Sequence, residues 1–216
     1  MKTSIARKVL MALSGFFLIS FLTLHFIINF ISVISPDNFN IASHWMGTNP
    51  VIQFAMQPVL IFGVVFHLAM GMRLEMQNNK ARGVKYAKNN PGANASWVSR
   101  NMIITGAMIF LFLGLHFYDF WVPEIIEKFS NGFGTDATRY YPELQHKFQD
   151  PARVGLYSVS FIFLALHLMH GFQSAFQSVG FNHSRYTPVL KALGKAFAIV
   201  VPLGFIFIAI FHYVSH

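Results

Sequence analysis

The chain alternates between long apolar runs and shorter polar connections. Five runs reach roughly the 20 residues that a helix needs to cross a bilayer core of about 30 Å. They cover residues 9–34, 51–72, 102–122, 154–176 and 196–214. Because a segment in lipid must satisfy its own backbone hydrogen bonds, each run predicts a transmembrane α-helix. The pattern therefore predicts an all-α fold, with one membrane domain of five helices over residues 1–216.

The composition supports a membrane protein. Hydrophobic residues make up 54% of the 216 residues and charged residues only 11%, which is few for the surface of a soluble domain. The basic start of the chain is similar to a signal peptide, but its apolar run is too long for one, so we expect a retained first helix. The sequence has no cysteine, which excludes disulfides, thiolate nucleophiles and cysteine-bound iron–sulfur clusters in this chain.

Basic residues are distributed unevenly between the two sides of the predicted bundle. Twelve of the 16 lie before the first run or in the connections 73–100 and 181–195, which share one side. The positive-inside rule places this side and the N-terminus in the cytoplasm. The net charge of +8 follows from this asymmetry, so no nucleic-acid partner is required. The basic 73–100 connection is either a docking surface for a partner or only a topology signal.

Four of the five runs carry a histidine deep within the apolar stretch. His25, His67, His116 and His167 each lie 16 or 17 residues from the point where their helix enters the membrane, which is about 24 Å along a helix. Because successive helices run in opposite directions, His25 and His116 share a depth nearer the outer face, and His67 and His167 share one nearer the cytoplasm. The two layers are predicted to lie roughly 10–20 Å apart.

Two facing imidazoles inside a helix bundle provide the two axial ligands that a b-type haem requires. Isolated polar contacts or a proton relay are the alternatives, but a relay would favour carboxylates, which the runs almost lack. The segment HLAMG that ends at Gly71 recurs as HLMHG, which ends at Gly171. A glycine four residues from a histidine lies on the same helix face and leaves room for the edge of the haem ring. The repeat favours His167 over the neighbouring His170 as the ligand.

The ordered set of runs and histidines resembles a known family. Together with the His-x-x-x-Gly-x-Arg pattern that ends at Arg73 and the opening RKVLMALSGFFLISFLTLHF, it is similar to the dihaem cytochrome b membrane anchor of bacterial succinate dehydrogenases and fumarate reductases. The resemblance covers nearly the whole chain and implies two haem b groups as cofactors. It implies that His25 and His116 bind the iron of a distal haem, and that His67 and His167 bind that of a proximal haem.

The resemblance also implies the function and the location. The chain would be a subunit of a succinate:quinone oxidoreductase in the bacterial cytoplasmic (inner) membrane, with the dicarboxylate site on a flavoprotein partner. An iron–sulfur subunit would dock on the cytoplasmic face, and electrons would pass through the haems to or from a quinone, expected to be menaquinone. Some family members carry a glutamate beside the ligand in the fourth helix. This chain has Ala165 and Leu166 there, so that proton route is not expected.

The remaining site residues are predicted from the chemistry of the ligands. Haem propionates are anionic and bind cations or hydroxyls, which favours Arg73 and Ser14; for Arg73 the alternative is a side chain that extends to the membrane interface. A quinone needs an apolar slot and hydrogen-bonding groups. The residues predicted to provide them near the outer layer are Asn29, His44, Gln53 and Asp119.

Two other functions stay open from the sequence. The first is the haem b anchor of another respiratory enzyme, such as a hydrogenase, which usually has a different histidine spacing. The second is a haem-free transporter or a structural membrane protein. Haem content distinguishes a haem-free transporter or structural protein from the two haem-binding anchors. The substrate that the assembled enzyme oxidises distinguishes a hydrogenase anchor from a succinate dehydrogenase anchor.

Overall fold

The computed structural model describes residues 4–81, 101–132 and 136–215, and within these ranges the chain is helical and contains no strand. Five helical stretches are long and apolar enough to cross a membrane: residues 5–34, 52–80, 102–130, 151–178 and 187–214. The chain is therefore an all-α, multi-pass membrane bundle, and this part of the prediction is confirmed.

The spans are built from single helices and from helices joined end to end. The first, fourth and fifth spans are α1 (Ser4–Ile34), α9 (Pro151–Ser178) and α10 (Thr187–Val214). The second joins the π-helical segment η1 (Ile52–Met56) to α3 (Gln57–Ala81). The third joins α6 (Met102–His116), the π-helical segment η2 (Phe117–Trp121) and α7 (Val122–Asn131). Two shorter helices, α2 (Pro36–Thr48) and α8 (Tyr140–Phe148), connect the spans.

The helices extend beyond the apolar runs that predicted them. The second span continues to Ala81 rather than ending near residue 72, and the last begins at Thr187 rather than near residue 196. Hydropathy marks the part of a helix that lies in lipid, whereas backbone hydrogen bonding continues into the polar region until a cap ends it. The connection 35–50 is largely helix α2, which begins where the Ser35 hydroxyl accepts a backbone N–H three residues on (3.3 Å).

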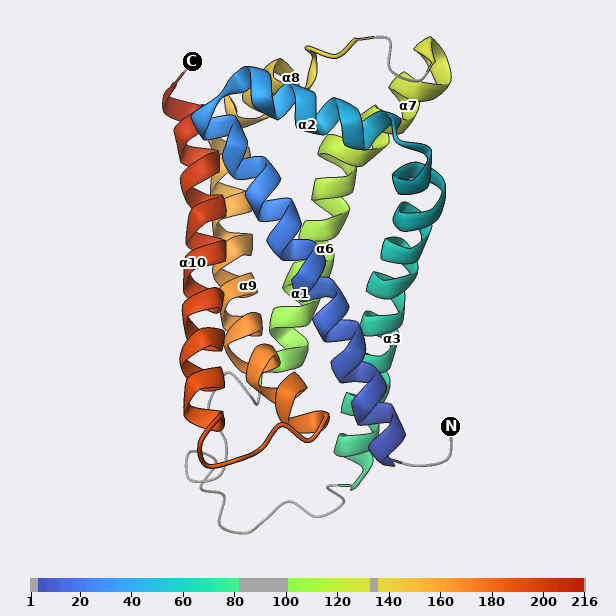
Figure 1. The fold of residues 1–216 in the computed structure, drawn as a ribbon, viewed down its shortest axis with the longest axis vertical. Helices are drawn as coiled ribbons and strands as arrows, with labels where there is room; N and C mark the ends of the chain where they lie inside the picture. The colour runs from blue at the N-terminus through green and yellow to red at the C-terminus, as the bar shows by residue number, and fades with distance from the viewer. Residues whose placement is uncertain (1–3, 82–100, 133–135, 216) are drawn as a thin grey trace.

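Figure 1 shows how the helices are arranged. α9 and α10 stand side by side along one flank, α3 forms the other flank, and α1 crosses the bundle obliquely. α2, α7, α8 and the C-terminus lie at one end, which we call the outer end. The N-terminus lies at the opposite, inner end. The distribution of basic residues predicts that the inner end faces the cytoplasm.

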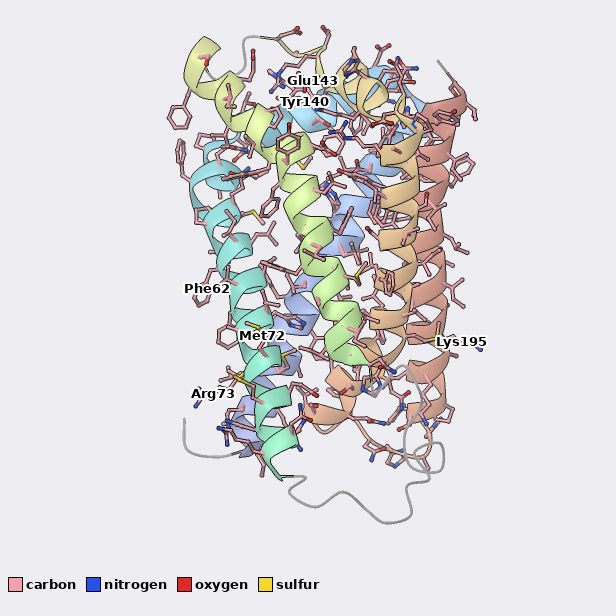
Figure 2. The ribbon with its side chains drawn as sticks, turned by 180° about the vertical axis from the view of Figure 1, so that it is seen from behind. Phe62, Met72, Arg73, Tyr140, Glu143 and Lys195 are labelled. Carbon is pink, nitrogen blue, oxygen red and sulfur yellow. The ribbon has the colours of Figure 1, made fainter. Side chains whose placement is uncertain are left out.

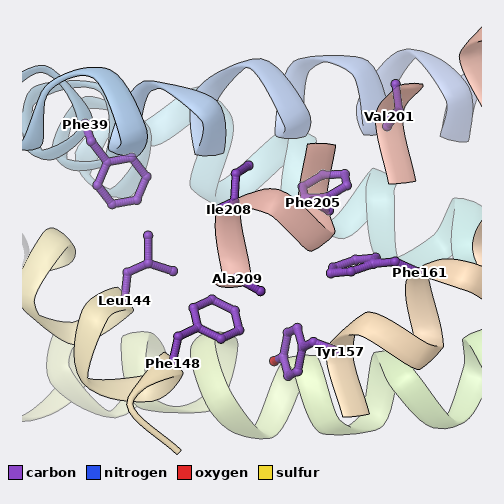
Figure 3. Close-up of a cluster of buried hydrophobic side chains, with 9 residues drawn as sticks. All are labelled: Phe39, Leu144, Phe148, Tyr157, Phe161, Val201, Phe205, Ile208 and Ala209. Carbon is purple, nitrogen blue, oxygen red and sulfur yellow. The ribbon is translucent and has the colours of Figure 1, made fainter. Parts of the chain in front are cut away.

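Apolar packing is tightest toward the outer end and weakest around α1 and α3. Nine buried side chains form one cluster between α2, α8, α9 and α10, in which the rings of Phe161 and Phe205 stack with centres 5.1 Å apart (Figure 3). Only 6% of the membrane-crossing window is buried in the first and second spans, against 39% in the fifth. Phe62 points outward from α3 (Figure 2), and Met72 on the same helix is also exposed, which suits contact with lipid.

Candidate functional site: two stacked histidine pairs

Two pairs of histidines face one another inside the bundle. The rings of His25 on α1 and His116 on α6 have centres 5.7 Å apart, with their planes at 86°. The rings of His67 on α3 and His167 on α9 have centres 6.4 Å apart, with their planes at 67°. The structure thus brings together the residues that the depth count paired, which we call the outer pair and the inner pair. It is the ring of His167 that lies against α3, and His170 lies one turn further toward the inner end.

The two pairs lie at different depths. Ser14 on α1 contacts His67 of the inner pair and precedes the outer histidine of its own helix by eleven residues. Thr105 on α6 contacts His167 of the inner pair and precedes the outer histidine of its helix by the same eleven residues. The inner and outer pairs are therefore about 16 Å apart along each helix, at 1.5 Å per residue. This is roughly half of a bilayer core of about 30 Å.

Two hydroxyl groups orient the inner pair. The Ser14 hydroxyl donates to the backbone carbonyl three residues earlier (2.8 Å) and lies 2.9 Å from Nδ1 of His67. The Thr105 hydroxyl on α6 likewise donates to the backbone carbonyl three residues earlier (3.0 Å) and lies 3.2 Å from Nδ1 of His167. Because each hydroxyl proton is directed to a carbonyl, the Nδ1–H of each ring donates to the hydroxyl oxygen, which leaves Nε2 unprotonated. This is the tautomer and orientation that a metal ion requires of a histidine ligand.

Ser14 has a partner that the sequence does not predict, and its predicted contact with a haem propionate stays a prediction. The sequence predicts that its hydroxyl contacts a haem propionate, whereas in the structure the hydroxyl contacts a histidine ring. Thr105, its counterpart on α6, is not predicted from the sequence. The signal was present, because both α1 and α6 carry Met-x-x-Ser/Thr-Gly with the glycine ten residues before the outer histidine.

The glycines of this repeat lie beside the inner pair. An added Cβ at Gly15 or Gly106 would meet only Cε1 of the adjacent inner histidine within 4 Å among the described residues, at 3.8 and 3.7 Å. The sequence instead assigns the space beside the haem ring to Gly71 and Gly171. An added Cβ at Gly71 would contact Cε of Met11 at 3.5 Å, and one at Gly171 would contact Cε of Met102 at 3.9 Å; both are the ends of flexible side chains.

The hydrogen bonds to the rings of the outer pair are longer, and all of those described are to His25. The Asn29 amide donates to the carbonyl of His25 (2.8 Å) and lies 3.4 and 3.5 Å from its two ring nitrogens. Nδ1 of His116 is buried without a hydrogen-bond partner among the described residues. The rings of Phe112 and Phe120 flank His116 with centres 5.7 and 5.3 Å away. Aromatic packing therefore orients the outer pair more than hydrogen bonding does.

A buried ion pair adjoins the outer pair. The helix becomes π-helical directly after His116, and Asp119 in this segment is 1% exposed. Arg153 on α9 donates to it from Nε (2.9 Å) and Nη2 (2.8 Å), and the Tyr157 hydroxyl donates to Oδ2 (3.1 Å). The ring of Tyr157 lies 6.4 Å from that of His116. π-helical segments are frequent at functional sites, and no periodicity in the sequence predicts this one.

A second polar cluster lies at the outer end. The Lys128 ammonium contacts Gln53 Oε1 (2.7 Å) and Glu124 (2.9 Å), and the Arg139 guanidinium binds both Glu124 and Glu143. Burial alone would lower the pKa of Arg139, but its hydrogen bonds to the two glutamates and their charges raise it. The cluster ties η1, α7 and α8 together.

The structure separates the four residues predicted to bind a quinone into two sites. Asn29 and Asp119 lie next to the outer pair. Gln53 belongs to the second polar cluster, and His44 packs with its ring 6.3 Å from that of Tyr140, which Figure 2 labels beside Glu143 at the outer end.

Two arginines at the inner end differ in placement. Arg73 is exposed on α3 and points away from the bundle (Figure 2), which favours extension to the interface over the predicted contact with a propionate. Arg7 on α1 is not predicted as a site residue, yet its Nε is buried without a hydrogen-bond partner among the described residues. Arg7 precedes Ser14 by seven residues, or two helical turns, and so shares its face of α1.

Fold and geometry define a polytopic membrane protein with two pairs of partly buried histidines at different depths. Comparison of the chain with models of protein families, with curated proteins and with solved structures finds no match. In the part of the chain that the structure describes, no group of three or more His, Cys, Asp or Glu side chains is arranged to hold a metal ion. The site therefore offers any metal two protein ligands at each depth.

Proposed function

We propose that each histidine pair binds one haem b and that the chain carries electrons across the membrane. The observation that carries the proposal is the separation of the ring centres, 5.7 Å in the outer pair and 6.4 Å in the inner pair. A metal–imidazole bond of about 2.0–2.1 Å, with the ring centre roughly 1 Å beyond the nitrogen, separates the centres of two opposed imidazole ligands by about 6 Å. Both pairs fit this separation.

The number of ligands supports haem over a bare metal ion. Structural zinc takes four protein ligands and catalytic zinc three, whereas the described histidines occur in pairs. A porphyrin supplies the four remaining ligands of its iron. Gly15 and Gly106 border the inner pair, because an added Cβ would contact Cε1 of an inner histidine at 3.8 and 3.7 Å, and the low burial of the first two spans suits a flat group between the helices.

A haem held by two histidines would supply one-electron transfer, because the protein ligands would leave no free site on the iron for oxygen. The residues of the chain tune and hold such a group. Ser14 and Thr105 keep the Nδ1–H groups of the inner ligands hydrogen-bonded, which makes their Nε2 atoms more basic. Arg7 is a partly buried cation whose Nε would be available to an anionic propionate. The separation of about 16 Å along α1 means that transfer between the pairs covers half of the membrane.

We further propose that the chain is the quinone-reactive anchor of a succinate:quinone oxidoreductase in the bacterial cytoplasmic membrane. The support is the resemblance of its spans and histidine order to that family. An iron–sulfur subunit would bind at the inner end and link the inner pair to a flavoprotein subunit. The quinone would bind near the outer pair, where Asn29 and Asp119 lie. Most of the connection predicted for docking, residues 82–100 of 73–100, lies outside the described residues.

The test is purification of the chain from its native membrane with whatever subunits accompany it. The proposal expects a flavoprotein and an iron–sulfur protein to co-purify, and succinate to reduce haem b in the complex. Reduction by hydrogen, with a hydrogenase subunit present, would instead identify the anchor of a different respiratory enzyme. A chain that carries no haem in its native membrane would favour the transporter alternative.

A further inference from the structure

α10 carries a histidine that the proposed electron path does not use. His212 lies near the outer end of α10, where its position in the sequence favours the membrane interface, yet its side chain is 0% exposed. Its Nε2 lies 2.9 Å from the hydroxyl of Ser32 on α1, which is itself 1% exposed. An ionisable side chain buried within a membrane span is costly and marks a functional site by default.

The same two helices place His212 close to the outer pair. Ser32 follows His25 by seven residues on α1. His212 follows Phe205 by seven residues on α10, and the ring of Phe205 lies 5.9 Å from that of His25. Seven residues span about 10 Å of helix. Within this interval Asn29 donates to the carbonyl of His25 (2.8 Å), and its own carbonyl accepts the Ser32 hydroxyl (2.6 Å).

The hydrogen bonds fix where His212 takes up a proton. Because the Ser32 hydroxyl donates to the Asn29 carbonyl, Nε2–H of His212 donates to the hydroxyl oxygen. The neutral ring thus carries its proton on Nε2, and a second proton binds at Nδ1. The contact on α1 is a neutral hydroxyl, so protonation of the ring adds a positive charge at this site.

Other titratable groups also lie at the outer end. The ring of Tyr141 on α8 faces His212 with its centre 5.4 Å away. The remaining titratable or charged groups at this end of the neighbouring helices are Asp37 and His44 on α2, Tyr140, Glu143, His146 and Lys147 on α8, Asp150 at the start of α9, and Arg153 and Tyr157 within α9. Glu143 pairs with an arginine and Arg153 with Asp119, while His146 and Lys147 line a cavity of about 280 Å³ beside Asp119.

We propose that His212 is a proton-binding site coupled to the electron on the outer pair, an inference that rests on the proposed function. Gain of one electron at the outer pair adds a negative charge about 10 Å away, which favours uptake of one proton from the outer aqueous phase by His212. Loss of the electron returns the proton to the same phase. The electron comes from a quinol or from the iron–sulfur partner, so each cycle moves one electron and one proton together.

The test is the pH dependence of the midpoint potential of each haem in the purified complex. The outer haem is identified by its retention in His67→Ala. Its potential should rise as the pH falls, by up to about 59 mV per unit, which corresponds to a tenfold change in a one-electron equilibrium. His212→Gln should abolish this slope and keep both haems, whereas His146→Gln, an exposed histidine at the same end, should retain it.

A second variant keeps the proposal testable if His212→Gln does not assemble. Ser32→Ala retains the ring and removes its hydrogen-bonding partner, so the pH range of the slope should move. A flat profile for the outer haem in the unmodified complex would overturn the proposal, as would a slope that is unchanged in His212→Gln or in Ser32→Ala. The absence of haem altogether would refute the proposed function instead.

Discussion

Removal of the Ser14 hydroxyl should weaken the inner haem site without disturbing the bundle. Ser14→Ala deletes the oxygen that lies 2.9 Å from Nδ1 of His67 and frees the ring to rotate and change tautomer. Loss of such a partner typically lowers metal affinity by about 10–100-fold, which corresponds to about 1.4–2.7 kcal/mol of binding free energy. Alanine favours a helix more than serine does, so the fold of α1 should be retained.

The measurement is the rate at which haem leaves the purified protein for an excess of a soluble haem-binding apoprotein. The inner haem should leave Ser14→Ala faster, and the outer haem should leave at the unmodified rate. Ser20→Ala is the matched control, because Ser20 lies on the same helix and its exposed hydroxyl donates only to a carbonyl four residues earlier (2.9 Å). Equal rates in the two variants would refute the role assigned to Ser14.

Three further outcomes test the site. Arg7→Gln should lower the midpoint potential of the inner haem, because a partly buried cation near a propionate stabilises the reduced form. Arg73→Gln should leave this potential unchanged, and an equal shift in both variants would contradict the role of Arg7. Gly106→Ala, whose Cβ would meet only a histidine at 3.7 Å among the described residues, should fold yet bind less haem by absorbance, whereas Gly155→Ala should bind the normal amount. Asp119→Ala should lower the free energy of unfolding by about 2–3 kcal/mol, as measured by thermal unfolding. This loss is smaller than for a fully buried ion pair, because Arg153 is partly exposed. A loss below about 0.5 kcal/mol would contradict the stabilising role of the Asp119–Arg153 pair.

The sequence predicts the fold well because lipid leaves few alternatives. An apolar run of sufficient length must be helical, so the five spans follow directly from hydropathy. The ends of the helices do not follow from hydropathy, since Thr187 and Ala81 lie in polar sequence beyond the apolar runs. The helical character of α2 was likewise hidden, because a short polar helix has no apolar run to mark it.

The depths of the paired histidines in the membrane could be predicted from the sequence, but the contacts around them could not. Counting residues along each span places the histidines in two layers, because the rise of a helix is fixed. The count says nothing about which neighbours lie around a glycine, such as the Met11 side chain that an added Cβ at Gly71 would contact at 3.5 Å. The burial of His212 depends on the packing of α10 against α1, and the inward position of Asp119 depends on a π-helical segment. Neither leaves a periodic trace in the sequence.

The most direct measurement is the number of haem b groups bound per chain, determined from the pyridine haemochrome spectrum and the protein concentration. The account predicts two for the unmodified chain and one each for His67→Ala and His25→Ala. A chain that binds none, or a His67→Ala variant that keeps both, would contradict it.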